Sequence, residues 1–582
     1  MPSIHAADIL PRRQNGVEFA DADAERQLAG ALDRVARPQE GFARVKHNPS
    51  RTVWRGDVDG VSLYVKHFHP RSLWGRLRRR LGFSDARREL RLSRRLRDAG
   101  VAAPRVLAAG REGQLEWVAS ETVTDAEPAD AWHARQRAAG REGHKRIRRA
   151  IRALARTVAR MHAAGVVHHD LHCGNLLVRE SDGECTFVVM DLHRARRRSG
   201  RRARAANLAQ LLHDRRDFTT RAERMRFLRA YLDAAGIGEQ VRGWDMLVAE
   251  LARRHTARQH AQRDRRIAGR NRYFAPVVLD RGWRGRVVLA SKRHPVGSRA
   301  AQMTFTAEAW RAALRRPERL LKGPEVEVVK DSPTSRVVRR TLTVAGEDLD
   351  VYLKQSHRKR RGKILLDCFR RGRGVQAFRL GHMLLTRRIA TALPLAGLER
   401  RRGPFLLDTI SVTEAVHAPR LNRFLDTHLG DAAGSGAKLD GPQRYQLAQG
   451  VLWQLGRLVQ GLHDHGFAHR DLKAPNMLVH WRRGELPEIV LVDLDGLRRT
   501  RLLTVRRRFQ GLMRLNVSLL KCPVVNHAGR LRMLLGYLRR PGCGRINFKP
   551  YWRVLEAWSA RKLNRQIRSR RRRQRALRRP VS

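Results

Sequence analysis

The sequence predicts an α+β protein built from two tandem copies of one domain. Residues 45–66 and 329–354 both start with Val-Lys, pass a proline, alternate apolar and polar residues around a Gly/Asp turn, and finish on an apolar strand that ends in lysine. Alternation on both sides of such a turn is typical of a β-hairpin. About a hundred residues later, each half has a long helical pattern, over 147–163 and 445–465. The same order of elements therefore occurs twice.

Each helical pattern leads into a polar loop and then into a short strand that ends in aspartate. The loops read VVHHDLHCGNLLV (166–178) and FAHRDLKAPNMLV (467–479), and the strands read FVVMDLH (187–193) and IVLVDLDG (489–496). The loop aspartate and asparagine are 5 residues apart in both halves, and the strand aspartate follows the loop aspartate by 21 and 22 residues. These residues are Asp170, Asn175 and Asp191 in the first half and Asp471, Asn476 and Asp493 in the second. Matching features about 300 residues apart indicate a tandem duplication.

The length of 582 residues fits two domains of about 250 residues better than four small ones. The expected division is an N-terminal extension (1–40), a first domain (41–275), a linker (276–310), a second domain (311–560) and a basic C-terminal tail (561–582).

Charge is the unusual feature of the composition. There are 121 Lys+Arg against 55 Asp+Glu, a net charge of +66, which favours polyanionic partners such as nucleotide phosphates, phosphorylated lipid surfaces or nucleic acid. Genomic bias toward arginine is the alternative source of this surplus. Five cysteines without a CxxC pair indicate neither a zinc site nor a disulfide framework and fit a reducing cytoplasm. No signal peptide and no apolar run of ~18 residues is expected, which argues against secreted and integral-membrane classes.

The repeated Asp/Asn/Asp set is suited to phosphoryl transfer. One aspartate accepts or orients the proton of the attacking hydroxyl, while the asparagine and the second aspartate hold Mg²⁺ against the nucleotide phosphates. The expected cation on those phosphates is Lys66 in the first half, with Glu89 as its helix partner, and Lys354 in the second half. Lys473 stands two residues after Asp471, within reach of the transferring phosphate. Each Asp or Asn taken alone is also a common capping or turn residue, and recurrence of the whole set argues against that alternative.

These motifs resemble known ones. HRDLKAPN followed by VDLDG is similar to the catalytic and metal loops of the protein-kinase superfamily, and HHDLHCGN followed by MDLHRAR is similar to its sugar- and antibiotic-phosphorylating relatives. Within that superfamily the chain resembles the bacterial lipopolysaccharide kinase (Kdo/WaaP) family. The Asp-Leu-His-Arg-Ala run (191–195), the Val-Lys…Tyr-Val-Lys hairpin and the basic segment after each strand lysine carry this resemblance.

The resemblance implies two protein-kinase-like domains, each with a small β-rich N-lobe and a larger helical C-lobe, and ATP in the cleft between the lobes. It further implies Mg²⁺- and ATP-dependent transfer of the γ-phosphate to a sugar hydroxyl, on Kdo or heptose of the lipopolysaccharide inner core. The implied residues are Asp170, Asp471 and Lys473 for catalysis, Lys66, Glu89 and Lys354 for the nucleotide, and Asn175, Asp191, Asn476 and Asp493 for the metal.

Several positions depart from the superfamily pattern. Neither half has a GxGxxG loop, so backbone amides and a nearby Arg or Ser must cover the phosphates. In the first half His169 replaces the arginine of HRD, His172 replaces the lysine, and no glycine follows Asp191-Leu192. In the second half Ala377 aligns with Glu89, so Lys354 is expected to lack a glutamate partner. A pseudokinase role for either half stays open.

The histidines of the first loop are expected to steady its backbone, with His168 and His469 packed inward, rather than to bind zinc. Basic segments interleaved with apolar residues, at 74–83 and 358–366, fit a helix lying on an anionic membrane or, alternatively, a solvated surface helix. Residues 561–579 hold eleven basic residues and no acid.

The predicted function is therefore an ATP-dependent kinase of a phosphorylated glycolipid, cytoplasmic and peripheral on the cytoplasmic face of the inner membrane. The predicted partners are ATP, the lipopolysaccharide core and an anionic membrane surface, with nucleic acid indicated by charge alone. A Ser/Thr protein kinase is one alternative, favoured by HRDLKAPN and disfavoured by the missing Gly-rich loop and by His169. A non-catalytic scaffold that grips nucleic acid or membrane is the other.

Overall fold

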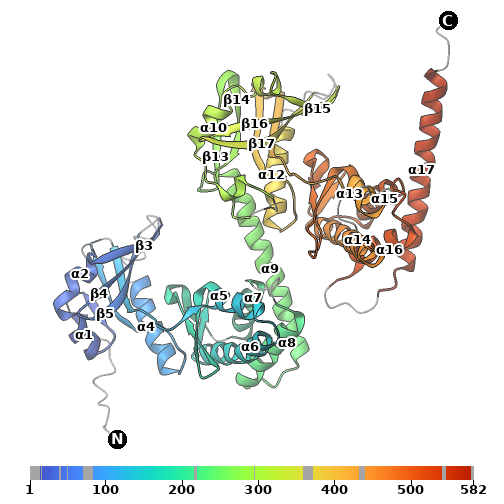
Figure 1. Ribbon diagram of the computed structural model, residues 1–582. Helices are drawn as coiled ribbons and strands as arrows, with labels where there is room; N and C mark the ends of the chain where they lie inside the picture. Colours follow the sequence, from blue (N-terminus) through green and yellow to red (C-terminus); the bar gives the residue numbers. More distant parts are fainter. Residues whose placement is uncertain are drawn as a thin grey trace. The chain divides into compact units, whose positions relative to one another are not determined.

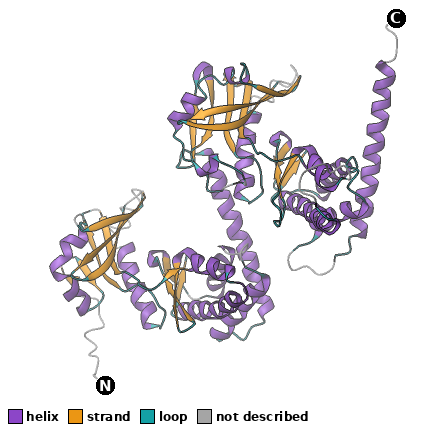
Figure 2. Cartoon of the chain, in the orientation of Figure 1, coloured by secondary structure: helices purple, strands orange, loops and turns teal. Residues whose placement is uncertain are grey.

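The computed structural model describes residues 13–14, 16–38, 41–48, 50–69, 83–113, 115–198, 200–214, 219–293, 295, 297–357, 371–430, 439–540 and 546–577. The chain forms two compact units, residues 1–258 and 259–582. Each unit has a seven-stranded antiparallel sheet followed by a mostly helical region (Figures 1 and 2). The sequence-predicted α+β fold in tandem duplication is confirmed.

The sheet of the first unit contains the predicted hairpin. Its strand order is β1 (Arg13–Gln14), β2 (Val17–Phe19), β6 (Val106–Glu112), β7 (Leu115–Glu121), β5 (Val61–Phe68), β4 (Arg51–Val58), β3 (Phe42–Asn48). The turn between β4 and β5 uses Asp59 and Gly60, both at positive φ, a conformation that glycine adopts without strain. Helix α4 (Asp85–Asp98) lies against β6 and β7 and begins at Ser84, whose hydroxyl accepts from the backbone N–H of Arg87.

The helical region of the first unit surrounds the polar loop. Its elements are β8 (Glu127–Pro128), α5 (Ala129–Ala138), α6 (Gly140–Ala163), β9 (Val166–His168), β10 (Leu176–Ser181), β11 (Glu184–Val189), β12 (Ala195–Arg197), α7 (Arg201–Asp214), α8 (Arg221–Ala234) and the first part of α9 (Val241–Ala268), which continues into the second unit from Gln259. Helix α6 buries Ile147, Ala150, Val158 and Met161, the apolar stripe that predicted it. Strand β9 follows α6 directly and leads into the loop, so the packed helix fixes where the loop begins.

The sheet of the second unit has the same order. It runs β13 (Phe274–Val278), β14 (Trp283–Val288), β18 (Pro394–Arg402), β19 (Phe405–Glu414), β17 (Glu347–Ser356), β16 (Ser335–Val344), β15 (Glu327–Ser332). Helix α12 (Arg373–Thr386) packs on β18 and β19, as α4 does on its own sheet. The remaining elements are α10 (Ala307–Ala313), α13 (Leu421–Leu429), α14 (Gly441–Asp464), β20 (Phe467–His469), β21 (Met477–His480), β22 (Glu488–Leu491), β23 (Leu497–Arg499), α15 (Val505–Leu519), α16 (His527–Leu538) and α17 (Lys549–Leu577).

The structure uses segments that the sequence analysis placed outside the domains. Residues 17–36 of the expected N-terminal extension form β2, α1 (Ala22–Leu28) and α2 (Leu32–Ala36), and Phe19 and Val35 lie fully buried in the first core. Within 276–310, the expected linker, β14 and the start of α10 join the second unit, and Trp283 and Trp310 are fully buried. Burial of such large apolar side chains favours adding these strands to the sheets.

Three sequence expectations concern the basic segments and the membrane. The segment 358–366 and all of 74–83 except Phe83 lie outside the described residues. The first part of the predicted tail continues helix α17 as far as Leu577. Within the described ranges, no helix is both long and apolar enough to cross a membrane.

Candidate active sites

The predicted lysine, glutamate and aspartate of the first half meet at one point. Lys66 on strand β5 places its Nζ 2.6 Å from Oε1 of Glu89 on α4 and 3.1 Å from Oδ1 of Asp191, which follows β11. All three side chains are largely buried, with exposed fractions of 13%, 5% and 19%. The structure thus brings together residues that are more than a hundred positions apart in the sequence.

Opposite charges keep this buried cluster ionised. Burial alone disfavours the ammonium of Lys66, but the carboxylates of Glu89 and Asp191 outweigh it and raise the pKa of Lys66 above its usual value. Burial alone also disfavours the carboxylate of Asp191, but Lys66 and Arg51 hold the pKa of Asp191 well below its usual range. Asp191 is therefore an anion at all physiological pH values.

Arg51 is a site residue that the sequence analysis did not single out. It begins β4, and its two terminal nitrogens lie 3.0 Å from Oδ1 and 2.9 Å from Oδ2 of Asp191, a bidentate pair. Asn48 shapes the preceding turn, since its Oδ1 accepts from the backbone N–H groups of Ser50 and Arg51. The sequence analysis expected backbone amides and a nearby Arg or Ser to cover the phosphates, but nothing distinguished Arg51 among 121 basic residues.

The first polar loop is held in shape by His168. This buried ring accepts at Nδ1 from the backbone N–H of Asp170, 3.1 Å away, and donates from Nε2 to the carbonyl of Met190, 3.0 Å away. Burial lowers the pKa of His168, so the ring is neutral, and one of its nitrogens can accept a hydrogen bond while the other donates one. Asn175 adds a hydrogen bond from its Nδ2 to the carbonyl of Asp170, 2.9 Å away. His168 is therefore buried and steadies the loop, as the sequence predicted, and it also ties the loop to Met190, the residue before Asp191.

The side chain of Asp170 has two basic neighbours. Nη1 of Arg194 lies 3.1 Å from Oδ2, and Nε2 of His172 lies 3.9 Å from Oδ1. Arg194 follows the Asp191 turn and is the arginine of the Asp-Leu-His-Arg-Ala run, but the sequence analysis gave it no role at the site.

The second half builds a related cluster with a different partner for its lysine. Nζ of Lys354 lies 2.5 Å from Oδ1 of Asp493 and 2.9 Å from Oδ2 of Asp495. As predicted, helix α12 supplies no glutamate, since 373–386 contains neither Asp nor Glu and Ala377 is buried. Burial lowers the pKa of Lys354, but the carboxylates of Asp495 and Asp493 outweigh this and raise it.

The second polar loop repeats the histidine arrangement. Nδ1 of His469 accepts from the backbone N–H of Asp471 at 3.1 Å, and its Nε2 donates to the carbonyl of Asp493 at 2.9 Å. Nδ2 of Asn476 donates to the carbonyl of Asp471 at 2.9 Å. Nζ of Lys473 lies 2.7 Å from Oδ2 of Asp471, so this lysine does stand beside the loop aspartate.

Both metal-loop aspartates have a left-handed backbone. Asp191 has φ 60° and ψ 46°, and Asp493 has φ 62° and ψ 73°. Non-glycine residues rarely adopt positive φ, and such strained positions are concentrated at functional sites. The two halves retain this conformation at the same position despite their different neighbours.

The donor groups of both halves fit Mg²⁺. Asp191 and Asp493 present carboxylate oxygens that positive side chains already surround, and in Asn175 and Asn476 the amide nitrogen is engaged, which leaves the amide oxygen as a ligand. Carboxylate and amide oxygens suit this ion, which takes few protein ligands and completes its shell with substrate phosphates and water. Among the described residues there is no group of three or more His, Cys, Asp and Glu that could hold a metal ion.

A β-rich lobe whose lysine and helix meet an Asp/Asn/Asp loop in a helical region defines a protein-kinase-like phosphotransferase, here present twice. The model of the lipopolysaccharide kinase (Kdo/WaaP) family matches residues 41–231 and 324–537. The chain belongs to this family, and it is a kinase.

Two of the proteins that this chain is similar to are sugar kinases. The lipopolysaccharide core heptose(I) kinase WaaP of Pseudomonas aeruginosa is 32% identical over 199 residues, which covers 31% of this chain and 73% of that protein. The 3-deoxy-D-manno-octulosonic acid kinase of Actinobacillus succinogenes is 28% identical over 176 residues, or 29% of this chain and 70% of that protein. A solved structure of WaaP in complex with acyl carrier protein has 28% identity to this chain, a TM-score of 0.32, and covers 40% of this chain and 94% of its own.

Proposed function

We propose that this chain transfers the γ-phosphate of ATP to a sugar hydroxyl of the lipopolysaccharide inner core, on Kdo or heptose, and that the first half performs the transfer. The observation that carries this proposal is the buried cluster of Lys66, Glu89 and Asp191, which is the nucleotide-binding arrangement of a kinase. The names of the similar kinases support the acceptor.

Each residue of the first half has a role in the proposal. Glu89 holds the ammonium of Lys66 where it contacts the α- and β-phosphates. Asp191 and Asn175 hold Mg²⁺, which neutralises charge on the phosphates when bound. Asp170 orients the acceptor hydroxyl and takes its proton as the new P–O bond forms and the bond to the ADP oxygen breaks. Because Arg194 occupies Oδ2 of Asp170, Oδ1 is the atom left for the hydroxyl.

The hairpin that covers the phosphates has Arg51 in place of a glycine-rich loop. In the absence of nucleotide this guanidinium neutralises Asp191. Nucleotide phosphates offer the same kind of oxygen pair, and a guanidinium binds such pairs in bidentate fashion. We therefore propose that Arg51 moves from Asp191 to the phosphates when nucleotide binds.

We propose that the second half has the corresponding site, with Asp471 as base, Asn476 and Asp493 as metal ligands and Lys354 on the nucleotide, but that transfer to the core does not depend on it. Lys473, beside Asp471, contacts the transferring phosphate. We further propose that the chain works at the cytoplasmic face of the inner membrane. Its net charge of +66 supports attraction to an anionic lipid surface.

The test is transfer of labelled γ-phosphate from ATP with Mg²⁺. The acceptors are purified lipopolysaccharide core, a generic protein and none, and the enzymes are wild type, Asp170→Asn and Asp471→Asn. We expect label in the core, lost in Asp170→Asn and retained in Asp471→Asn. Loss only in Asp471→Asn would move the transfer to the second half. Label in protein alone, or in no acceptor despite bound ATP, would overturn the proposal.

A further inference from the structure

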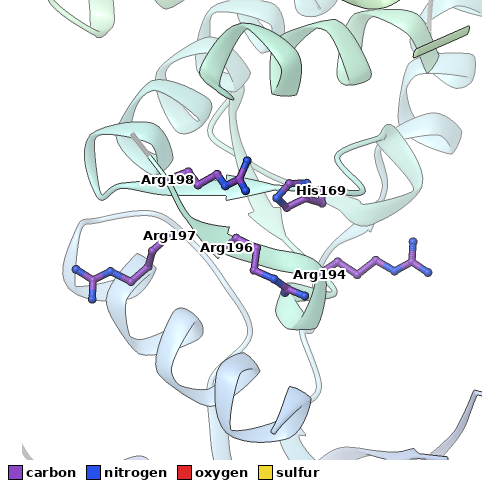
Figure 3. A pocket seen from close by; sticks show the side chains of 5 residues that line it. All are labelled: His169, Arg194, Arg196, Arg197 and Arg198. Carbon is purple, nitrogen blue, oxygen red and sulfur yellow. The ribbon is translucent and has the colours of Figure 1, made fainter. Parts of the chain in front are cut away.

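A hollow of strongly basic lining lies beside the catalytic loop of the first half. It is open to solvent, has a volume of about 560 Å³, and is lined by His169, Arg194, Arg196, Arg197 and Arg198 (Figure 3). Arg196 and Arg197 lie on β12, which pairs with β9, the strand that leads into the loop of Asp170. The hollow is thus built on the two strands that carry the loop and the turn after Asp191.

The positive charge of the hollow is poorly compensated. Arg194 is paired with Asp170, and Arg196 donates to the carbonyls of His193 and Ala195. Arg197 and Arg198 are exposed, and neither forms an ion pair with a carboxylate in the part of the chain that the structure describes. Figure 3 shows Arg198 and His169, which directly follow β12 and β9, extending toward each other.

His169 adds a group that is neutral rather than cationic. Burial lowers its pKa, and Arg196 and Arg198 lower it further by repelling a second positive charge. A neutral imidazole beside guanidinium groups supplies one more hydrogen bond without adding repulsion. In protein kinases an arginine occupies this loop position, so the first half presents a different surface here.

The corresponding surface of the second half carries less positive charge. The pairing of β23 with β20 matches that of β12 with β9, so Gly496 and Thr500 stand where Arg194 and Arg198 stand in the first half. The counterpart of Arg197 is Arg499, which lies 2.6 Å from Oδ2 of Asp264. Arg498 and Arg470, the counterparts of Arg196 and His169, are exposed. The second half thus has three arginines at these five positions, against four arginines and a histidine in the first half.

We propose that this hollow binds an oxoanion of the acceptor, a phosphate monoester or a sugar carboxylate, next to the hydroxyl that receives the new phosphate. This rests on the proposed function, in which the first half acts on an inner-core sugar. Guanidinium groups match carboxylate and phosphate oxygens in bidentate fashion. Since Arg194 lines the hollow and also contacts Asp170, an anion seated here places its sugar at the base. The site would select acceptors that already carry a negative group.

The test uses the full chain and the double variant Arg197→Gln/Arg198→Gln. The control is Arg148→Gln/Arg152→Gln, which removes the same charge from exposed positions on α6. The probe is a core oligosaccharide in three forms: untreated, phosphatase-treated, and with its carboxylates reduced. Binding is measured by calorimetry without ATP, and KM is measured by labelled transfer.

We expect the double variant to bind the untreated oligosaccharide at least about tenfold more weakly than wild type, with a matching rise in KM, since hydrogen bonds to charged groups are worth this much. The control should bind like wild type. The treatment that reduces wild-type binding to the level of the double variant identifies the anion as phosphate or carboxylate.

Equal binding of all three forms by wild type, or equal loss in the control, would overturn the inference. The binding measurement separates it from the proposed function. Transfer to the core without any preference for an anionic form would leave the kinase function standing and refute the inference that the hollow binds an oxoanion. Suppose instead that wild type binds an anionic form preferentially, that the double variant loses this preference, and that wild type transfers no phosphate. The inference about the hollow would then stand, and the proposed kinase function would be refuted.

Discussion

Replacing Glu89 with glutamine tests the most consequential contact of the first half. In wild type, Lys66 is shared between Glu89 at 2.6 Å and Asp191 at 3.1 Å. Without the Glu89 charge, the ammonium would pair with Asp191 alone, and Asp191 is the carboxylate needed for the metal. Nucleotide would then have to break that remaining pair before Lys66 could contact its phosphates.

The structure sets the size of the effect. Removing one partner of a buried ion pair costs about 3–5 kcal/mol, and the side chain of Glu89 is only 5% exposed. Glutamine keeps a hydrogen-bond acceptor and Asp191 remains as a partner of Lys66, so we expect a smaller free-energy cost, about 2–3 kcal/mol. This corresponds to a fall in kcat/KM for ATP of roughly 30- to 160-fold.

The assay is steady-state transfer of labelled phosphate at varied ATP, with thermal unfolding to verify that Glu89→Gln is folded. Asp98→Asn is the matched control, because it removes one carboxylate from an exposed position at the end of the same helix. We expect the control to stay within about twofold of wild type, as an exposed charge contributes little. A folded Glu89→Gln enzyme whose kcat/KM lies within threefold of wild type would refute the role of Glu89.

Two further predictions concern stability. Arg51→Met removes both hydrogen bonds to Asp191 and should lower the free energy of unfolding of the nucleotide-free first unit by about 1.5–3 kcal/mol, measured by urea unfolding; an unchanged midpoint would contradict it. Burial lowers the pKa of His162 to about 4 from 6.5, so this histidine is neutral in the folded chain and takes a proton in the unfolded chain below pH 6.5. Its contribution is therefore lost as pH falls from 6.5 toward 4, about 2 kcal/mol by pH 5. Urea unfolding at pH 7 and pH 5 measures this loss, and an equally steep loss in His162→Gln would rule out this histidine as the cause.

Much of each site could be predicted because phosphoryl transfer requires its aspartate and asparagine residues at particular separations along the chain. The loop Asp and Asn must lie within one turn of chain, and the metal aspartate must follow a buried strand, so a short repeated pattern revealed them. Lys66 and Glu89 could be predicted because a strand end and the next helix are neighbours in such a sheet. The structure places Lys66, Glu89 and Asp191 within hydrogen-bonding distance.

Other site residues act through contacts that leave no local pattern. Arg51 reaches Asp191 across the fold, and in a chain with 121 basic residues an individual arginine carries little information. Arg194 stands in the Asp-Leu-His-Arg-Ala run, but that motif did not indicate its contact with Asp170. Asp495 was visible in the sequence as part of VDLDG, but its role as partner of Lys354 follows only from the distance between β17 and the turn after β22. The outer strands β13 and β14 were missed because each is short and bounded by arginines.

The two halves hold the same strained aspartate with different charge balances. In the first half two cations, Lys66 and Arg51, face the two carboxylates of Glu89 and Asp191, while in the second half Lys354 alone faces two carboxylates, those of Asp493 and Asp495. Because nucleotide phosphates are anionic, the balanced cluster of the first half repels them less than the net negative cluster of the second. The second half has an additional cation beside its loop aspartate, since Lys473 lies next to Asp471. Duplication thus preserved the geometry of the site but moved its positive charge, which argues that the first half binds nucleotide more tightly.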